Sequence, residues 1–465
     1  MKKIILLLSV ISLMLVLTFS ASAENEFKTL DGKAYTEDEN TKIIDGVVYR
    51  LCTSDKDKHY DVYDWFDSEE TFESLEEINI VPEIDGTPVM GIMCKLVYNS
   101  NTGFNHNYAD VYHNYSVKKI TIPDTIKKIG DGAFSIFDGL EELVVPASVD
   151  LKDNYHCFDN MDALKRITFL GDVPYIYGFI NKDELESVTI NGYVTQIGAD
   201  AFKNCSYLKS FKVLGYLENQ KFEIGTNAFK NCISLKEFVF PKETKDFKIG
   251  KSAFEYCTAL KNITFPEKCG NITIGEAAFM DCQTLKAITL PEVCGNFDIG
   301  KNAFYTCMAA KTLAFPKECG NLNIGERAFG NLVKIKSIEF PAKSGSIVIG
   351  KNAFDYCYRV TTVKNTGNIV KIYAEAFSDC EALKSFTISA KTTLIGKKAF
   401  YECRKLKTVN INSNTKLPEI YANAFGLTSS SIIFNAKNEK MAKELKTALK
   451  ASGMKKTKIY YIKYI

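Results

Sequence analysis

The chain has 465 residues, of which 46% are apolar and 25% are charged. This apolar content excludes a disordered chain, and the length suits either two or three ordinary domains or one long array of repeats. The formal net charge is +2 and the basic residues form no concentrated stripe, which excludes the nucleic-acid-binding class.

Residues 1–23 have the pattern of a secretory signal peptide. Two lysines precede an apolar run that ends at Phe19, and small residues at Ala21 and Ala23 follow it. The run has about 16 residues, fewer than the ~20 that a membrane-spanning helix needs. We therefore predict cleavage after Ala23 and export to the cell surface or medium. No later segment is apolar enough to predict a transmembrane helix.

Residues 24–115 form a predicted acidic N-terminal cap region, with 20 acidic against 7 basic side chains. The acidic stretch Asp55–Glu70 fails as an EF-hand calcium loop, because Tyr60 stands where glycine is needed and Phe66 where glutamate is needed. We interpret this stretch as a solvated acidic and aromatic loop. Adventitious calcium binding or a partner contact is the alternative.

The histidines are His59, His106, His113 and His156. None lies in a zinc or hydrolase motif, and no phosphate-binding glycine loop is present. A Cys–His pair or metal site involving Cys94 stays an alternative to a plain surface role. We predict no catalytic residue, no cofactor and no metal ligand, with a small enzyme or metal site in the N-terminal region as the third alternative for function.

A repeat of 23 to 27 residues occupies residues 116–432 in about 13 units. Its anchor is the phenylalanine of an Ala-Phe pair, for example Phe254, Phe279 and Phe304. Such a period is typical of a leucine-rich-repeat solenoid, in which each unit adds one coil and buries its apolar face only against its neighbours.

Each unit predicts a short strand and a helical turn. Residues 262–265 alternate between polar and apolar types, which indicates a strand with its polar side chains facing solvent. An irregular turn follows, and Ala278, Phe279 and Cys282 then share one face of a helical turn. The predicted fold class is an α/β repeat solenoid: a leucine-rich-repeat superhelix with a short parallel strand per coil, short helical turns on the opposite face, and caps at both ends.

The unit L-x-x-I-x-I-P followed by I-G-x-x-A-F-x-x-C resembles the leucine-rich repeats of BspA-type surface proteins. Residues 80–92 also resemble the strand and turn with which such arrays often begin. The resemblance implies a curved coil with a parallel sheet on one face, surface display, and binding to proteins or cells. It implies no catalytic residue.

Glycine follows the isoleucine in eight units, whereas Tyr373 and Tyr421 stand in that place in two others. Because a bulky aromatic residue is disfavoured at positive φ, we expect an ordinary backbone at this position. We then expect glycine to be favoured at this position because neighbouring coils leave little room for a side chain.

The cysteines fall into two columns of the repeat. Eight lie three residues after the repeat phenylalanine, and Leu332 replaces them in one unit, which indicates buried packing and not disulfides. The second column contains Cys269, Cys294 and Cys319, with Thr or Ser one period away on either side, which predicts a turn nearer the surface. A thiolate metal site or redox cluster at the second column is the alternative, although no C-x-x-C pair supports it.

The solvent-facing strand positions form the candidate binding face. Its members are Thr168, Thr189, Lys212, Val239, Asn262, Thr264, Thr289, Thr312, Glu339, Lys364, Thr387 and Asn410. These side chains are short, polar and almost free of aromatic rings, so a protein or another cell-surface macromolecule is a better expected partner than a carbohydrate. The face measures about 800 Å², one partner's share of a standard protein interface.

Residues 433–465 form a predicted C-terminal helix and strand cap. Met441, Leu445 and Leu449 line one face of the helix, and lysines cover its polar side. These lysines could also retain the protein weakly on an anionic cell wall.

We predict an exported, non-enzymatic repeat protein that acts in adhesion or protein recognition at the cell surface. The structural alternative is head-to-tail self-assembly, because residues 436–465 carry 9 basic against 2 acidic side chains and oppose the acidic N-terminal region.

Overall fold

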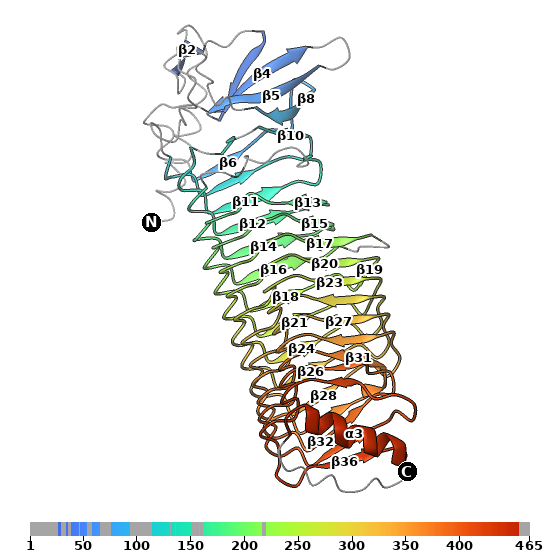
Figure 1. The fold of residues 1–465 in the computed structure, drawn as a ribbon. Helices are drawn as coiled ribbons and strands as arrows, with labels where there is room; N and C mark the ends of the chain where they lie inside the picture. Colours follow the sequence, from blue (N-terminus) through green and yellow to red (C-terminus); the bar gives the residue numbers. More distant parts are fainter. Residues whose placement is uncertain are drawn as a thin grey trace, which may run out of the picture.

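The computed structural model describes residues 27–28, 34–35, 39–45, 47–53, 58–65, 76–93, 114–130, 132–134, 136–150, 158, 161–215 and 220–454. These residues form an elongated stack of coils, with β4 (Val47–Thr53) and β5 (Lys58–Trp65) at one end and helix α3 (Glu439–Ala451) at the other (Figure 1). The predicted signal peptide and its cleavage site lie outside the described residues.

One side of the stack, here called the strand face, carries three parallel sheets that follow one another. The first contains β6 (Glu77–Asn79), β9 (Lys119–Thr121), β11 (Glu142–Val145), β12 (Arg166–Phe169), β14 (Ser187–Ile190), β16 (Ser210–Val213), β18 (Glu237–Val239) and β21 (Asn262–Thr264). The second contains β24 (Ala287–Thr289), β26 (Thr312–Ala314), β28 (Ser337–Glu339) and β30 (Thr362–Lys364). The third contains β32 (Ser385–Ile388), β34 (Thr408–Ile411) and β36 (Ile433–Ala436).

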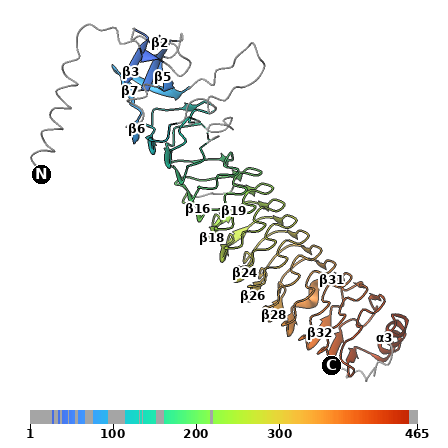
Figure 2. The ribbon, with the colours of Figure 1, turned by 90° about the vertical axis from the view of Figure 1, so that its left-hand side faces the viewer.

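A second parallel sheet runs along another side of the same coils (Figure 1), and Figure 2 shows the elongated stack turned by 90°. Its strands are β13 (Tyr175–Ile176), β15 (Gln196–Ile197), β17 (Phe222–Ile224), β20 (Phe247–Ile249), β23 (Ile272–Ile274), β25 (Phe297–Ile299), β27 (Leu322–Ile324), β29 (Ile347–Ile349), β31 (Ile369–Ile372), β33 (Leu394–Ile395) and β35 (Glu419–Ile420). A short third ladder pairs β19 (Glu243–Thr244) with β22 (Lys268–Cys269) and continues as isolated bridges.

The second sheet corrects the predicted irregular turn between strand and helical turn. In β23 the side chains of Ile272 and Ile274 are buried and Thr273 is exposed, the alternation of a strand with one buried face. Three residues are too few to stand out as a periodic signal in one unit, but stacking places a strand at this position in eleven coils. Each complete coil therefore contributes two strands and not one.

The predicted helical turns are tight turns. Ala277 has φ of 54° and Asp281 has φ of 60°, both in the left-handed region that a right-handed helix excludes. Their backbone N–H groups donate to the next coil, Ala277 to Lys301 O at 2.7 Å and Asp281 to Tyr305 O at 3.0 Å. Other N–H groups of the turn donate three residues back, as Met280 does to Ala277 O at 3.1 Å, so bonds within the coil alternate with bonds to the next coil and no continuous helical ladder forms in this turn.

The core is a stack of like residues from successive coils. The rings of Phe254 and Phe279 lie 5.0 Å apart and those of Phe279 and Phe304 lie 4.9 Å apart, nearly parallel in each case. All three rings are fully buried. Burial of each contributes about 1.5–3 kcal/mol relative to an exposed ring, so the array holds together by contact between neighbouring units.

Crowding explains the glycine column, as predicted. Neither Tyr373 nor Tyr421 has positive φ, and Gly275 does not have it either. A Cβ atom on Gly275 would lie 2.6 Å from the carbonyl carbon of Gly250 in the preceding coil, closer than real Cβ contacts allow.

Packing also explains the eight-cysteine column, as predicted. These cysteines are Cys205, Cys232, Cys257, Cys282, Cys307, Cys357, Cys380 and Cys403, all buried and free. Each thiol donates to the carbonyl of a repeat phenylalanine in the preceding coil, for example Cys282 to Phe254 at 3.2 Å. Leu332, the one exception, is fully buried as well.

The N-terminal strands form a separate sheet that joins the array. Antiparallel strands β3 (Thr41–Ile44), β4 and β5 pair in order, and β5 then pairs in parallel with β8 (Thr87–Ile92), which pairs with β10 (Lys128–Ile129). β7 (Glu83–Ile84) forms a hairpin with β8, and β1 (Phe27–Lys28) pairs with β2 (Ala34–Tyr35). The predicted solvated loop Asp55–Glu70 is thus in part strand β5, because Tyr60 and Val62 alternate with polar residues and are buried.

At the C-terminal end, α3 packs against β36 and β35. Its buried residues are Met441, Leu445 and Leu449, the apolar face that the sequence predicts. The Asn438 side chain accepts a hydrogen bond from the Met441 N–H at 2.9 Å and begins the helix. The predicted terminal strand, residues 459–465, lies outside the described residues.

Candidate functional site

All twelve residues of the candidate binding face lie on strands of the strand face. Thr168, Thr189, Thr387 and Asn410 are half-buried and the other eight are exposed. In β21 the order exposed, buried, exposed for residues 262–264 confirms the predicted alternation. The structure therefore brings these positions into columns on one surface, although they are up to 242 positions apart in the chain.

The strand face has an uncharged central stretch. Over the three coils from β21 to β26 its outward residues are Asn262, Thr264, Ala287, Thr289, Thr312 and Ala314, and the neighbouring strand β18 presents Val239 and the charged Glu237. Val239 is 55% exposed, a large value for an apolar side chain on a sheet. The outward side chains of this stretch are short, which suits close approach of a complementary surface.

Ion pairs between neighbouring coils flank that stretch. Arg166 pairs with Glu142 at 3.1 Å toward the N-terminal end, and Lys364 pairs with Glu339 at 3.5 Å toward the C-terminal end. Both pairs are largely exposed, and such pairs contribute only about 0–1 kcal/mol. The charges of Glu339 and Lys364 are therefore partly satisfied within the protein.

A column of lysines lies at the border of the strand face, one residue before each strand. These lysines are not part of the candidate binding face that was predicted from the sequence. It contains Lys236, Lys261, Lys286, Lys311 and Lys336, one from each of five successive coils. The backbone N–H of Lys261 donates to Lys236 O at 2.8 Å, and that of Lys286 donates to Lys261 O at 3.1 Å. The signal in the sequence is the recurrent apolar-Lys pair that precedes each strand.

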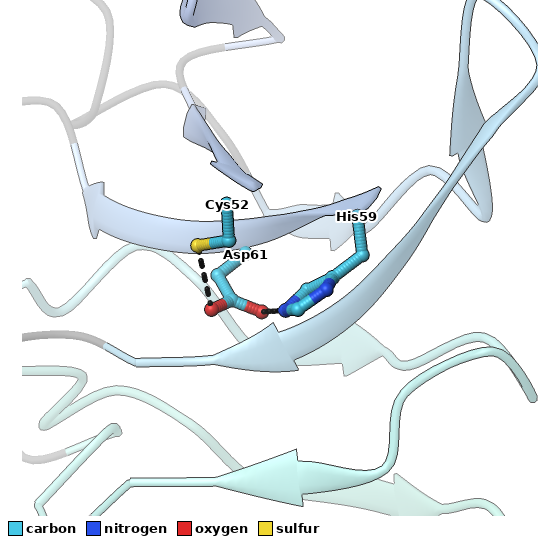
Figure 3. Close-up of side chains that lie close together, drawn as sticks. All are labelled: Cys52, His59 and Asp61. Carbon is cyan, nitrogen blue, oxygen red and sulfur yellow. Dashed lines mark hydrogen bonds and ion pairs between the residues drawn. The ribbon is translucent and has the colours of Figure 1, made fainter. Parts of the chain in front are cut away.

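Three chemically distinct side chains meet in the N-terminal sheet: Cys52 on β4, and His59 and Asp61 on β5 (Figure 3). The Cys52 Sγ donates to Asp61 Oδ2 at 3.3 Å, and His59 Nε2 lies 3.5 Å from Asp61 Oδ1. One ligand atom from each residue lies within 4.8 Å of the other two. No other such group of three occurs in the described part of the chain.

The order in which the three side chains contact one another disfavours a role for Cys52 as a nucleophile. Burial and the hydrogen bond to Asp61 raise the pKa of the Cys52 thiol, whereas a nucleophilic cysteine needs a lowered pKa and an adjacent imidazole base. Here the carboxylate lies between thiol and imidazole. The arrangement is suited to coordination chemistry and not to acyl transfer.

The second cysteine column lies partly inside the protein. Cys294 is buried, and Cys269 and Cys319 are half-buried, so the predicted turn is nearer the surface than the core column but not open. Cys319 and Cys294 hydrogen-bond through their thiols, which lowers the pKa of Cys319 and raises that of Cys294. Burial raises the pKa of Cys269 to about 12. His106, His113, His156 and Cys94 lie outside the described residues.

The coils and their buried columns define a leucine-rich-repeat solenoid of parallel strands. The model of the BspA type leucine rich repeat region matches residues 107–223, 222–348 and 322–445 in 6 copies, and the chain belongs to this family. No curated protein matches the chain.

Several solved bacterial proteins are similar to this chain. A leucine-rich repeat protein from Bacteroides ovatus is 20% identical, with a TM-score of 0.47 over 85% of this chain and 100% of its own. A leucine rich cell surface protein from Faecalibacterium prausnitzii is 19% identical, with a TM-score of 0.32 over 87% and 97%. The pneumococcal vaccine antigen PcpA is 18% identical, with a TM-score of 0.33 over 90% and 97%.

The family is associated with the cell surface and with protein binding. No helix among the described residues is long and apolar enough to cross a membrane.

Proposed function

We propose that this protein is exported and acts, without catalysis, in protein recognition or adhesion at the cell surface. The uncharged central stretch of the strand face carries this proposal. Three coils there, β21 to β26, present short uncharged side chains on parallel strands, so a partner can approach the backbone of these strands closely. Membership of the BspA-type family supports the same role.

A protein partner fits this surface better than a carbohydrate. The outward residues of the central stretch include no aromatic ring, and sugar recognition commonly uses exposed rings as platforms. The central stretch also lacks the aromatic and arginine side chains that contribute most of the binding energy in protein interfaces, so we expect a modest affinity for the partner.

Binding through the strand face is tested with long cationic substitutions. The double variant Thr264→Arg/Thr289→Arg places two bulky groups in the central stretch. Thr273→Arg in β23 is the control, because Thr273 is also exposed but lies on the other sheet. We expect the double variant to lose retention on a panel of immobilised extracellular matrix proteins and the control to keep it.

Equal retention of the double variant and the native protein would exclude the strand face as the binding surface. Lack of retention of the native protein by every matrix protein would contradict the adhesion role itself. Export is tested separately: mass spectrometry of the secreted protein should find Glu24 as the first residue, in line with predicted cleavage after Ala23.

A further inference from the structure

The hairpin of β4 and β5 places three metal-binding side chains on one face. Cys52 and His59 are direct partners in the antiparallel register, and Asp61 follows His59 by two residues on the same strand. Because side chains alternate along a strand, all three project to the same side. We propose that Cys52, His59 and Asp61 bind a zinc ion, with water as the fourth ligand.

The distances suit this ion. Zinc forms bonds of about 2.0–2.3 Å to thiolate, imidazole and carboxylate in tetrahedral geometry, which places ligand atoms about 3.3–3.7 Å apart. Asp61 Oδ2 lies 3.3 Å from Cys52 Sγ and Asp61 Oδ1 lies 3.5 Å from His59 Nε2, and one ligand atom from each residue lies within 4.8 Å of the other two. A small rotation of the Asp61 carboxylate therefore brings one oxygen close to both partners. A thiolate and a carboxylate together also neutralise the two charges of the ion.

Two features of the surroundings support a ligand here. The His59 Nδ1 atom is buried and has no hydrogen-bond partner among the described residues, and an ion or a water molecule at this site would explain such an unsatisfied polar atom. Gly91 on β8 leaves space for the Asp61 carboxylate, since a Cβ atom there would lie 2.5 Å from Asp61 Oδ1. Glycine at this position of β8 thus leaves room for the carboxylate beside Cys52 and His59.

Zinc binding is measured on the purified protein by competition with a chromophoric chelator. We expect one zinc per chain, and we expect Co²⁺ to give a thiolate charge-transfer band that Cys52→Ser abolishes. Cys52→Ser and His59→Ala each remove a direct ligand and should weaken zinc binding by at least the 10–100-fold that loss of an outer partner costs. Cys319→Ser is the control, because Cys319 is also half-buried but lies in the array.

Gly91→Ala tests the geometry without removing a donor, and it should also weaken zinc binding through displacement of Asp61. Circular dichroism checks that each variant keeps its fold. The proposal is overturned if the native protein retains no zinc, or if Cys52→Ser binds it as tightly as the native protein does.

The lysine column carries a second and independent inference. In the preceding coils the same column alternates in sign, and Lys165 pairs with Glu141 at 3.0 Å and Lys209 with Glu186 at 2.8 Å. From Lys236 to Lys336 all five members are lysines, and none has an acidic partner within 4.0 Å among the described residues.

Unpaired like charges at strand spacing repel one another, so this column lowers stability unless an anion covers it. Five lysines at about 4.8 Å intervals form a straight cationic row of about 19 Å. Other columns behave differently: Lys251 pairs with Glu276 at 3.1 Å and Lys317 with Glu292 at 2.9 Å. The cationic row is therefore a local exception.

We infer that the row binds a linear acidic polysaccharide, which lies along the stack and presents charges to successive lysines. The inference rests on the proposed role at the cell surface and goes beyond it, because the row lies beside the strand face and binds its ligand by charge, which needs no aromatic platform. A single-stranded nucleic acid fits less well, because the outward positions of the adjoining strands lack aromatic side chains on which bases stack.

Retention on heparin at rising salt tests the row, with unsulfated dextran as the neutral probe. The triple variant Lys261→Gln/Lys286→Gln/Lys311→Gln should elute at clearly lower salt than the native protein. Its matched control is Lys251→Gln/Lys301→Gln/Lys317→Gln, which removes the same charge from lysines that have acidic partners. We expect the control to elute close to the native protein.

Identical elution of the two triple variants would overturn the inference, because retention would then follow net charge alone. Equal, row-dependent retention on single-stranded DNA would overturn the assignment to polysaccharide. Loss of matrix-protein binding by Thr264→Arg/Thr289→Arg with intact heparin retention separates the strand face from the row.

Discussion

At the residue scale, the glycine after each isoleucine sets how closely two coils approach. Gly275→Ala adds a Cβ atom 2.6 Å from the Gly250 carbonyl carbon, and this contact is with backbone that cannot rotate away. We expect a loss of about 1–3 kcal/mol in the free energy of unfolding, measured by urea denaturation. Gly367→Ala should change it little, because no atom lies within 4 Å of the added methyl group.

Cysteine reactivity should differ between the two columns. Burial raises the pKa of the Cys205 thiol in the core column to about 12, so this thiol stays protonated and unreactive in the native state. The Cys294 thiol stabilises the Cys319 thiolate and lowers the pKa of Cys319, so its thiolate forms at lower pH than that of an ordinary cysteine. Cys319 should be alkylated first among Cys269, Cys294 and Cys319 as pH rises, which peptide mass spectrometry measures.

The substitutions within the two cysteine columns were enough to predict that one column lies in the core and the other in a turn. The replacement by Leu332 predicted a buried site, and full burial confirms it. The thiol-to-carbonyl bonds between coils and the Cys294–Cys319 contact could not be predicted, because both depend on the offset between neighbouring coils.

At the element scale, α3 shows how one amphipathic helix covers the last strand. Leu445 is buried against the array, whereas its neighbour Lys446 is exposed. Leu445→Ala should cost about 2–5 kcal/mol in local stability through lost burial and the cavity left behind. Faster hydrogen exchange in β36 should report that loss, and Lys446→Ala should leave exchange unchanged.

The strands of the strand face were predictable because apolar and polar residues alternate over each of them. The second sheet could not be predicted from the sequence, and neither could the tight turns that replace the predicted helical turns. In both cases the deciding hydrogen bonds run to the next coil, as from Ala277 to Lys301, and a local pattern does not contain them.

At the scale of the whole molecule, charge separates the two ends of the chain. Head-to-tail assembly would use the acidic N-terminal region and the basic C-terminal segment, but α3 packs over β36 at the C-terminal end of the array. We expect a molecular mass by light scattering that is the same at low and high salt, because a covered end strand offers no edge for pairing. A mass that falls as salt rises would favour the self-assembling alternative.

The sequence by itself determined the solenoid, its period and its buried columns, because each coil repeats the same requirement for burial and repetition makes a weak signal visible. Only the tertiary structure decided which surface groups come together. Cys52, His59 and Asp61 meet through strand register, and the cationic row emerges from five lysines that are 25 residues apart in the chain. Stacking of the coils makes neighbours of residues that are distant in the chain. The periodic pattern within one unit does not contain this information.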